Sequence, residues 1–452
     1  MDGYRQLSTS GLLGYGFPEA SLAAGMARKP HMIGVDGGST DPGPYYLGSG
    51  KCLNSRIAMK RDLRLMLKAA RAADIPLVIG SCGGAGASSH VDAVDGIVRE
   101  IAHEEGLSFK LAIIRSDQQK DDVRRWRREK RLKPLRNVPG LTEDAIDASA
   151  NIVAMMGPEP FAAALDGGAQ VVLAGRSSDP APWAACATRA QLPPAPAWYA
   201  GKMLECGATA SLPKGHDCLI TTVHRDGVEL EPTNPIRRCT PLSVANHSLH
   251  ENSSPCYHVE PGGLLDTSDC TFEAMNDRAV FVSGMQWETR PYTVKLEGAA
   301  AAGYRAITIC GTRDPGLIRI MDDYLASVRE NVATKAADFG IPPDGYTLLF
   351  RQYGRNGVMA EREPALDDTP HEVGLLVEVV APTQDEANAV LSIARVNTLH
   401  VDFPGRLCKE GNMAFPFSPS DIQTGPAYRF SVFHVLEDAD PIGMFPIEYH
   451  EV

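Results

Sequence analysis

His31-Met-Ile-Gly-Val-Asp-Gly-Gly-Ser-Thr-Asp-Pro-Gly-Pro44 is the stretch that decides the fold. Its apolar beginning predicts a buried strand, and the glycines, prolines and polar side chains that follow predict a loop at the end of that strand. The loop carries both carboxylates and hydroxyl groups. The stretch therefore predicts a strand that delivers polar side chains to one edge of a sheet.

The same pattern returns later in the chain, where Gln170-Val-Val-Leu-Ala-Gly-Arg-Ser-Ser-Asp-Pro180 is again an apolar strand followed by a polar loop. Ser39-Thr-Asp-Pro42 thus has a counterpart in Ser177-Ser-Asp-Pro180. A third strand and loop lie between them, in Ile75-Pro-Leu-Val-Ile-Gly-Ser-Cys-Gly-Gly-Ala-Gly86. In an open parallel sheet, ligands bind in the crevice beyond the carboxyl ends of the strands. We expect the functional site where these three loops meet.

Helical patterns of crossover length separate the strands, at 56–73 and 87–105. A further helix is predicted at 143–156, with Thr142 as its N-cap. This alternation predicts an α/β domain at 1–235, with a mostly parallel, right-handed wound sheet and helices on both faces. We expect this domain to carry the site.

The remainder of the chain predicts two further parts, since 452 residues exceed what one core usually supports. Residues 236–303 are rich in Asn, Ser, His, Pro and Gly, and we expect an irregular linking region there. Residues 304–452 show strands and helices in the order βαββαβ, which predicts a ferredoxin-like α+β domain.

The composition narrows the function classes. A net charge of -12 and an isoelectric point near 5.5 argue against nucleic acid as a partner, because phosphate binding needs a basic surface. The sequence lacks a long apolar run and the features of a signal peptide, so we expect no membrane segment. Ten cysteines without a Cys-x-x-Cys pair indicate reduced thiols in the cytoplasm. Cys82 and Cys206, each beside glycine, are interpreted as structural thiols rather than nucleophiles.

Asp41 and Asp179 are the first candidates for catalysis. If the two Asp-Pro loops face each other across the crevice, these carboxylates could share a proton, hold a divalent metal or orient a hydroxylated substrate. Each Asp could instead cap its own turn, as Asx-Pro sequences commonly do. The sequence places no histidine near them, so a metal is the less favoured functional alternative.

Hydroxyl and backbone N–H groups of the two Ser-[Ser/Thr]-Asp-Pro loops suit an anion such as a carboxylate or phosphate, above all where a helix begins just after the loop. Arg176 stands at a strand end and could clamp a carboxylate with two hydrogen bonds, or form an ordinary ion pair. The Gly-rich third loop lacks the Lys-[Ser/Thr] of a P-loop. The predicted substrate-binding residues are Asp36, Gly38, Ser39, Thr40, Ser81, Gly83, Gly84, Arg176, Ser177, Ser178 and Glu205.

Three further candidates for catalysis lie after residue 235. Lys295 and Glu297 are two residues apart on a predicted strand, so both side chains point to one face and could act as acid and base, or form a surface pair. His247 is either a proton carrier or a loop histidine with ordinary partners. The predicted catalytic residues are therefore Asp41, Asp179, His247, Lys295 and Glu297.

Six segments, spread over nearly the whole chain, carry a family resemblance. They are Leu13-Gly-Tyr-Gly-Phe-Pro18, Ile33-Gly-Val-Asp-Gly-Gly-Ser-Thr-Asp-Pro-Gly-Pro-Tyr-Tyr-Leu-Gly48, Leu173-Ala-Gly-Arg-Ser-Ser-Asp179, Glu205-Cys-Gly-Ala208, Val294-Lys-Leu-Glu-Gly-Ala299 and Ala414-Phe-Pro-Phe-Ser-Pro-Ser-Asp421. With them, the sequence resembles the acyclic terpene utilisation protein A (AtuA) family, long catalogued as a domain of unknown function. The resemblance implies a role in the bacterial breakdown of branched or terpenoid acids, including their coenzyme A (CoA) thioesters. It supplies no settled set of catalytic residues.

The resemblance also bears on partners. Longer family members carry an added C-terminal ferredoxin-like domain, and this chain ends at Glu451-Val452, where that extension would begin. The resemblance therefore implies a small separate subunit that supplies the domain. We expect a homo- or hetero-oligomer.

Together, the residues and the resemblance predict an enzyme without a redox cofactor. It would act as a hydro-lyase, isomerase or hydrolase on a small or branched unsaturated or hydroxy carboxylic acid, or on its CoA thioester. Asp41 or Asp179 would move the proton while the hydroxyl groups and Arg176 hold the carboxylate. A divalent metal is an open alternative for the same site. The alternative function is that of a noncatalytic metabolite-binding or scaffold subunit in a heteromeric catabolic complex.

Overall fold

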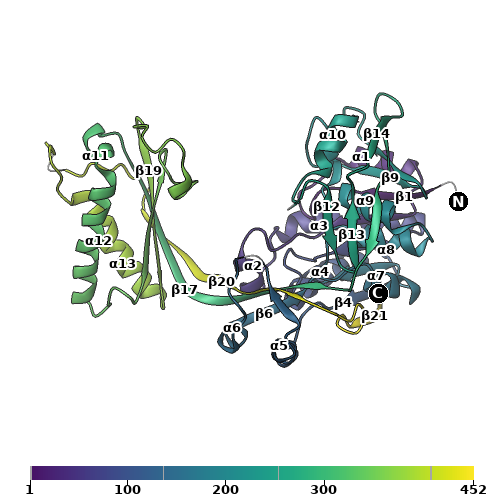
Figure 1. Cartoon of the computed structure of the whole chain (residues 1–452), viewed down its shortest axis with the longest axis horizontal. Helices are drawn as coiled ribbons and strands as arrows, with labels where there is room; N and C mark the ends of the chain where they lie inside the picture. Colours follow the sequence, from purple (N-terminus) through teal and green to yellow (C-terminus); the bar gives the residue numbers. More distant parts are fainter. Residues whose placement is uncertain (1–2, 136, 253, 408–409) are drawn as a thin grey trace. The chain divides into compact units, whose positions relative to one another are not determined.

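The computed structural model describes residues 3–135, 137–252, 254–407 and 410–452 (Figure 1). Its contacts divide the chain into two compact units. Unit 1 contains Met1–Ala300 and Phe430–Val452, and unit 2 contains Ala301–Arg429. The chain passes from unit 1 into unit 2 within strand β17 (Val294–Thr312) and returns within β20 (Asp421–Leu436). Unit 2 is therefore an insertion in the chain of unit 1.

Unit 1 is built around a ten-stranded mixed sheet. Five neighbouring strands at its centre are parallel, in the spatial order β1 (Tyr4–Ser8), β2 (Met32–Asp36), β3 (Leu77–Gly80), β7 (Val171–Ala174) and β4 (Lys110–Ile114). Antiparallel strands extend both sides, namely β9 (Leu219–Val223), β10 (Gly227–Pro232), β15 (Val280–Ser283) and β14 (Thr271–Ala274) beyond β1, and β21 (Ile447–Glu451) beside β4. The sheet is thus parallel at its centre and antiparallel at its edges.

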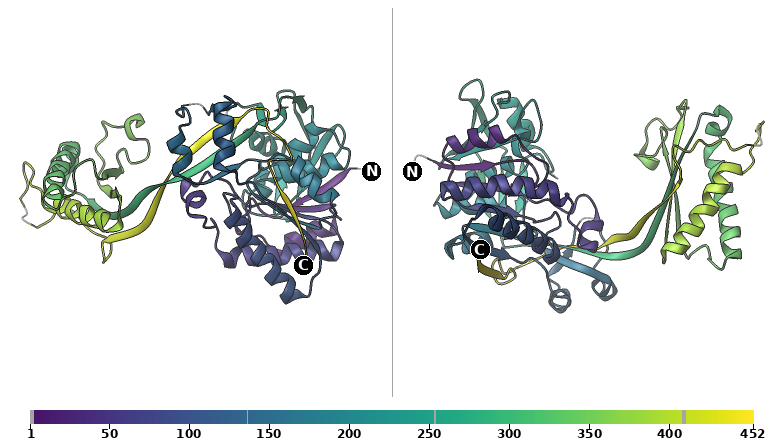
Figure 2. Two further views of the ribbon diagram at one scale, coloured as in Figure 1. Left: turned by 90° about the horizontal axis from the view of Figure 1, so that it is seen from below. Right: turned by 180° about the vertical axis from the view of Figure 1, so that it is seen from behind.

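The central strands are buried on both faces, so their residues alternate between two cores. Ile33 and Val35 of β2 face a core formed with α1 (Glu19–Ala27), α3 (Arg56–Ala73) and α4 (Ser88–Glu105). Met32 faces the other core, formed with α7 (Glu159–Asp166), α8 (Ala181–Arg189) and α9 (Pro194–Leu204). Helices α3 and α4 lie side by side on their face of the sheet (Figure 2). Burial on both faces explains why β2 reads as a continuous apolar run.

Residues 143–156, predicted as one helix, form two different elements. Helix α6 (Glu143–Ala148) begins as predicted, with the Thr142 hydroxyl accepting a hydrogen bond from the backbone N–H of Ala145. The chain then becomes strand β6 (Ser149–Ala154), which pairs antiparallel with the first part of β17. A partner strand from far along the chain therefore decides this conformation. The remaining elements before β7 are α2 (Pro44–Ser49), α5 (Lys120–Arg128) and β5 (Leu132–Pro134).

Residues 236–300, expected as part of an irregular linking region, belong to unit 1 and hold regular elements. The elements near this region not yet named are η1 (Gly207–Ala210), β8 (Ser211–Leu212), β11 (Arg238–Cys239), α10 (Pro241–Ser248), β12 (Tyr257–Glu260), β13 (Gly263–Asp266) and β16 (Gln286–Thr289). Strands β12, β13 and β16 form a small antiparallel sheet, and β8 pairs with β11. Because these strands have only two to four residues, the turn residues between them dominate the composition.

Unit 2 has the element order strand, helix, strand, strand, helix, strand. Between the two long strands it contains α11 (Pro315–Arg319), α12 (Met321–Asp338), β18 (Thr347–Tyr353), η2 (Ala360–Arg362), β19 (Val373–Ala381) and α13 (Gln384–His400). The strand order is β18-β19-β17-β20, and α12 and α13 share one core with the sheet. Residues 430–452, expected in this domain, lie in unit 1, where β21 completes the large sheet. Among the described residues, no helix combines the length and the apolar composition that crossing a bilayer requires.

Candidate functional site

Three loops meet at the carboxyl edge of the central sheet in unit 1. They follow β2, β3 and β7, and β3 lies between the other two strands. Glycine lets the loops pack closely. A Cβ on Gly37 would lie 2.4 Å from the carbonyl oxygen of Ser81, and a Cβ on Gly86, whose φ is +68°, would lie 2.1 Å from the backbone nitrogen of Arg176. The two Ser-[Ser/Thr]-Asp-Pro loops consequently lie on either side of the Gly-rich loop.

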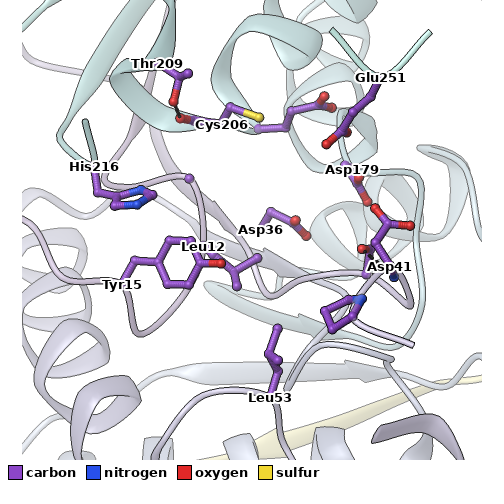
Figure 3. Close-up of a pocket in the computed structure, with 14 residues that line it drawn as sticks. Leu12, Tyr15, Asp36, Asp41, Leu53, Asp179, Cys206, Thr209, His216 and Glu251 are labelled. Carbon is purple, nitrogen blue, oxygen red and sulfur yellow. Dashed lines mark hydrogen bonds between the residues drawn. The ribbon is translucent and has the colours of Figure 1, made fainter. Parts of the chain in front are cut away.

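A cavity of about 290 Å³ opens at this edge (Figure 3). This volume lies just below the range for small-molecule sites, which begins at roughly 300 Å³. Its carboxylates come from Asp36, Asp41, Asp179, Glu205 and Glu251. The other lining residues are Gly11, Leu12, Tyr15, Ser39, Pro42, Leu53, Cys206, Thr209 and His216. Carboxyl groups thus dominate the polar lining of the cavity, and no lysine or arginine is among the described residues that line it.

Asp41 is exposed at the mouth of the cavity, and its carboxylate does not cap its own turn. The turn is closed by Ser39, whose hydroxyl oxygen accepts a hydrogen bond from the backbone N–H of Asp41 at 3.1 Å. No group among the described residues donates a hydrogen bond to the Asp41 carboxylate. In Figure 3 this carboxylate lies beside Asp179. Asp41 is therefore available for a ligand in the cavity.

Arg176 lies behind the wall of the cavity and is almost fully buried, with 3% of its surface exposed. Its Nε donates to Glu297 Oε2 at 2.8 Å, and its Nη1 donates to Asp179 Oδ1 at 3.0 Å and to Ser81 Oγ at 3.1 Å. Two carboxylates thus balance the guanidinium charge. Arg176 orients Asp179 and does not itself line the cavity.

Glu297 of β17 is completely buried at the centre of this network. Its Oε1 accepts hydrogen bonds from Thr40 Oγ1 at 2.6 Å and from Lys295 Nζ at 2.8 Å. Burial alone would raise the pKa of Glu297, but the charges of Arg176 and Lys295 lower it to about 2. Glu297 is therefore ionised at neutral pH and ties β17 to two of the loops. Lys295 is paired with it on the same strand face, as the two-residue spacing predicts.

Asp36 is the last residue of β2, directly before the first Asp-Pro loop, and is 6% exposed. Its Oδ1 accepts a hydrogen bond from the backbone N–H of Gly38 at 3.1 Å. Burial and the nearby charge of Asp179 raise the pKa of Asp36 well above its usual value, against the opposing effect of the Gly38 hydrogen bond. Asp36 therefore holds its proton over a wider pH range than an ordinary aspartate.

Two glutamates, Glu205 in the lining of the cavity and Glu260 outside it, also have raised pKa values. Burial raises the pKa of Glu205 to about 8, although Lys202 donates to its Oε1 at 2.7 Å. Burial raises the pKa of Glu260 in β12 to about 7, although the hydrogen bond that Ser178 Oγ donates to Glu260 lowers it. Carboxyl groups that bind protons near neutral pH are suited to general acid catalysis.

His247 lies in the last turn of α10 and does not line the cavity. Its ring stacks on that of His250, with 4.3 Å between the ring centroids. Burial and the charges of His250 and Lys202 lower the pKa of His247 to about 3. The ring is therefore neutral at physiological pH, which does not suit the proton carrier that the sequence predicted.

Several predicted substrate-binding residues hold the loops in place. Ser81 Oγ lies 3.4 Å from Ser177 Oγ, which joins the Gly-rich loop to the loop after β7. Gly83 and Gly84 have φ values of +68° and +108°, so they permit the turn of the Gly-rich loop. Of all the predicted catalytic and substrate-binding residues, those that line the cavity are Asp36, Ser39, Asp41, Asp179 and Glu205.

Comparison with known proteins decides the family. The model of the acyclic terpene utilisation family protein AtuA matches residues 57–413. The chain belongs to the AtuA family. The description of this family implies a catabolic role in acyclic terpene utilisation. Neither the search of curated proteins nor the search of solved structures found a match for this AtuA-family chain.

Other residues in or beside the cavity were not anticipated. Glu251 and His250 follow α10, in a region without a periodic pattern, so no local signal points to them. Tyr15 and His216 pack edge to face, with 4.5 Å between their ring centroids, across the cavity from Asp41 in the view of Figure 3. For Tyr15 a signal existed, because it lies in one of the segments that carry the family resemblance.

Replacing Asp36 by Asn is expected to stabilise unit 1 at neutral and alkaline pH. The native pKa of Asp36 lies above the unfolded value of about 3.9, so the folded state binds more protons and loses stability as pH rises. The asparagine side chain keeps an acceptor for the Gly38 N–H but has no charge. We expect a gain on the order of 1 kcal/mol above pH 7 and none below about pH 4.

The measurement for Asp36→Asn is urea unfolding followed by tryptophan fluorescence at several pH values. All four tryptophans of this AtuA-family chain lie in unit 1, so the signal reports that unit. A difference between variant and wild type that does not change with pH would contradict the assignment of a raised pKa to Asp36.

Proposed function

We propose that this chain is a catabolic enzyme that acts without a redox cofactor on a small or branched unsaturated or hydroxy carboxylic acid, or on its CoA thioester. The reaction would be a hydration or dehydration, an isomerisation or a hydrolysis. One observation carries the proposal: Asp41 and Asp179, from two matching loops, lie beside each other at one small cavity that Asp36 also lines. Paired carboxyl groups in such a cavity can exchange protons with a bound substrate.

The two aspartates differ in a way that suits separate roles. Asp179 accepts a hydrogen bond from buried Arg176, so its orientation is fixed and its charge is stabilised. Asp41 has no such partner, so its carboxylate is free to contact a ligand. We assign proton transfer to Asp41 and Asp179, with Asp36, whose raised pKa lets it keep a proton, as a neighbouring proton store.

The charge of the cavity favours one form of the substrate. Arg176 and Thr40, which the sequence predicted as holders of a carboxylate, are both engaged with Glu297. A free carboxylate would therefore meet a cavity whose described lining has five carboxyl groups and no lysine or arginine. The acyl group of a CoA thioester carries no charge, and about 290 Å³ is enough for a short acyl group while the nucleotide part stays outside. We therefore favour the thioester over the free acid.

Solvent deuterium exchange tests a hydration, dehydration or isomerisation, and product formation in the same samples tests a hydrolysis. Small unsaturated and 3-hydroxy acids, as free acids and as CoA thioesters, are incubated with the protein in D₂O and followed by mass spectrometry. A base in the cavity is expected to incorporate deuterium next to the carbonyl carbon of at least one thioester. Absence of both exchange and turnover over the whole panel, with protein of normal thermal stability, would contradict the proposal.

A second candidate function is favoured by one face of unit 2. Helices α12 and α13 cover one face of its sheet, whereas Ile309, Leu349 and Tyr353 point to the other face and are 36–48% exposed. Apolar side chains on an open sheet face suit a protein partner. In this case the chain would be a metabolite-binding or scaffold subunit that binds a small ferredoxin-like subunit through this face. A ligand-dependent rise in melting temperature without turnover would favour this function.

We further propose that unit 2 is itself a ferredoxin-like sandwich. The βαββαβ order of its elements, the strand order β18-β19-β17-β20 and the location of both long helices in one core support this assignment.

A further inference from the structure

Cys206 supplies the one thiol among the described residues that line the cavity. It is partly buried, lies just beyond the end of α9 and shares a wall of the cavity with Glu251 in Figure 3. Its backbone carbonyl accepts a hydrogen bond from Thr209 Oγ1 at 2.6 Å, which holds the residue in place. The sequence alone indicates a structural thiol here, but a thiol that borders a cavity can reach a bound ligand.

His250 lies next to the sulfur of Cys206, and its tautomer is fixed. Its Nδ1 lies 2.9 Å from the carbonyl oxygen of His247, which can only accept, so Nδ1 carries the proton. Nε2 is then the acceptor, and it lies 3.2 Å from Cys206 Sγ, within reach of the S–H group. Burial and the charge of Lys202 lower the pKa of His250, so the ring is neutral and can take up a proton at physiological pH. A nucleophile, a base within hydrogen-bond reach and a group that orients the base are the parts of a catalytic triad.

Two carboxyl groups lie where a positive charge on His250 would need compensation. Glu205 Oε1 is 3.4 Å and Glu251 Oε2 is 3.7 Å from His250 Nε2. The ring of His247 stacks on that of His250, with 4.3 Å between the ring centroids, and this contact restrains the ring orientation. Once Nε2 has taken up a proton, both oxygens attract it, so the surroundings favour the imidazolium that a proton transfer from sulfur would create.

The sulfur of Cys206 keeps its proton until it reacts. Burial raises the pKa of the Cys206 thiol, so the resting group is not a thiolate at neutral pH. Its proton must therefore pass to His250 while the sulfur attacks, in the way that a serine hydroxyl passes its proton to a histidine. The reactivity of Cys206 consequently depends on His250.

We propose that Cys206 is a nucleophile that takes up the acyl group of a thioester substrate, with His250 as its base; the substrate class rests on the proposed function. Cys206 Sγ bonds to the carbonyl carbon, and its proton passes to His250 Nε2. The bond between that carbon and the sulfur of CoA breaks. The leaving sulfur takes the proton from His250, so CoA departs as a thiol and the acyl group stays on Cys206.

Water completes the cycle in a hydrolysis. Its oxygen bonds to the carbonyl carbon while His250 takes one of its protons, the bond to Sγ breaks, and the sulfur recovers the proton from His250. Between the two steps the covalent bond holds the acyl group in the cavity that Asp41 and Asp179 also line. A free carboxylate is a poor acyl donor, so thioesters are expected to react with Cys206 and free acids are not.

Exchange of labelled CoA tests the acyl-enzyme. The protein is incubated with each CoA thioester of the panel and an excess of isotope-labelled free CoA, and the thioester is analysed by mass spectrometry. An acyl group that moves reversibly to Cys206 returns to a labelled CoA, so the label is expected in the thioester. Cys206→Ala should abolish this exchange, and His250→Asn should lower its rate by about 10²-fold or more. Wild-type protein quenched in acid should carry the acyl group on the peptide that contains Cys206.

Matched controls separate this pair from other thiols and imidazoles. Cys256→Ala replaces a partly buried cysteine that does not line the cavity, and His103→Asn replaces an exposed histidine of α4, so both should exchange label as the wild type does. Absence of label exchange over the whole panel, or unchanged exchange in a Cys206→Ala variant of normal thermal stability, would overturn the proposal. Deuterium incorporation without label exchange would overturn the acyl-enzyme and leave the proposed function intact.

Discussion

Turnover is expected to fall by about 10²- to 10⁴-fold when Asp179 or Asp41 is replaced by Asn, which is the range that one positioned proton carrier contributes. Asn has the same shape as Asp but cannot exchange a proton with the substrate. In Asp179→Asn the side-chain oxygen can still accept the hydrogen bond from Arg176, so the loop should keep its conformation. The measurement is the rate of deuterium incorporation, and of product formation, on the best thioester of the panel.

Asp440→Asn is the matched control for these two variants. Asp440 also precedes a proline, is exposed and belongs to unit 1, but it does not line the cavity. Its carboxylate accepts hydrogen bonds from the backbone N–H groups of Ile442 and Gly443, which makes it the turn-capping type of Asp-Pro. Asp440→Asn should retain full turnover. Equal rates for wild type, Asp41→Asn and Asp179→Asn would show that neither aspartate moves the proton.

Replacing Arg176 by Met is expected to lower the free energy of unfolding of unit 1 by about 3–5 kcal/mol, the usual cost of removing one partner from a buried ion pair. The substitution leaves Glu297 buried with only Lys295 to balance it, and it releases Asp179. Because the loops after β3 and β7 both hydrogen-bond to Arg176, they should loosen as well. Urea unfolding followed by tryptophan fluorescence measures the effect.

Two further variants define the cause of this loss. Arg28→Met removes an ion pair with Glu231 in which the arginine side chain is 52% exposed, and it should cost less than about 1 kcal/mol. The double variant Arg176→Met with Glu297→Met leaves neither charge of that pair buried alone, so it should recover much of the lost stability. If Arg176→Met were no more destabilising than Arg28→Met, the network would not stabilise the loops as described.

The sequence predicts the centre of unit 1 well because local patterns determine it. The bounds of α3 agree with the predicted helix at 56–73, and β2 lies in the predicted apolar run. Local patterns do not predict an element whose conformation depends on a strand far along the chain. β6 reads as the continuation of a helix, and only its pairing with β17, about 150 residues later, makes it a strand. The short strands between 236 and 300 could not be predicted for a different reason. Turn residues there outnumber the residues that alternate between apolar and polar.

The candidate site likewise has residues that the sequence predicts and residues that it does not. The repeated Ser-[Ser/Thr]-Asp-Pro motif points to Asp41 and Asp179 without any structure. The engagement of Arg176 by Glu297 cannot be predicted, because the two residues are 121 positions apart and nothing in either segment encodes the contact. His250 and Glu251 lie after α10 with no pattern around them. A motif repeated within one chain is therefore informative, whereas a charge pair between distant segments needs coordinates.

The position of β21 has a consequence for biosynthesis. This strand pairs with β4, yet the ribosome completes it only after the whole of unit 2 has been made. At roughly 5–20 residues per second, the backbone groups along that side of β4 stay without their final partner for tens of seconds. An unprotected strand edge invites pairing with other nascent chains. Production of this protein should therefore respond strongly to lower temperature and to chaperones that shield nascent polypeptides.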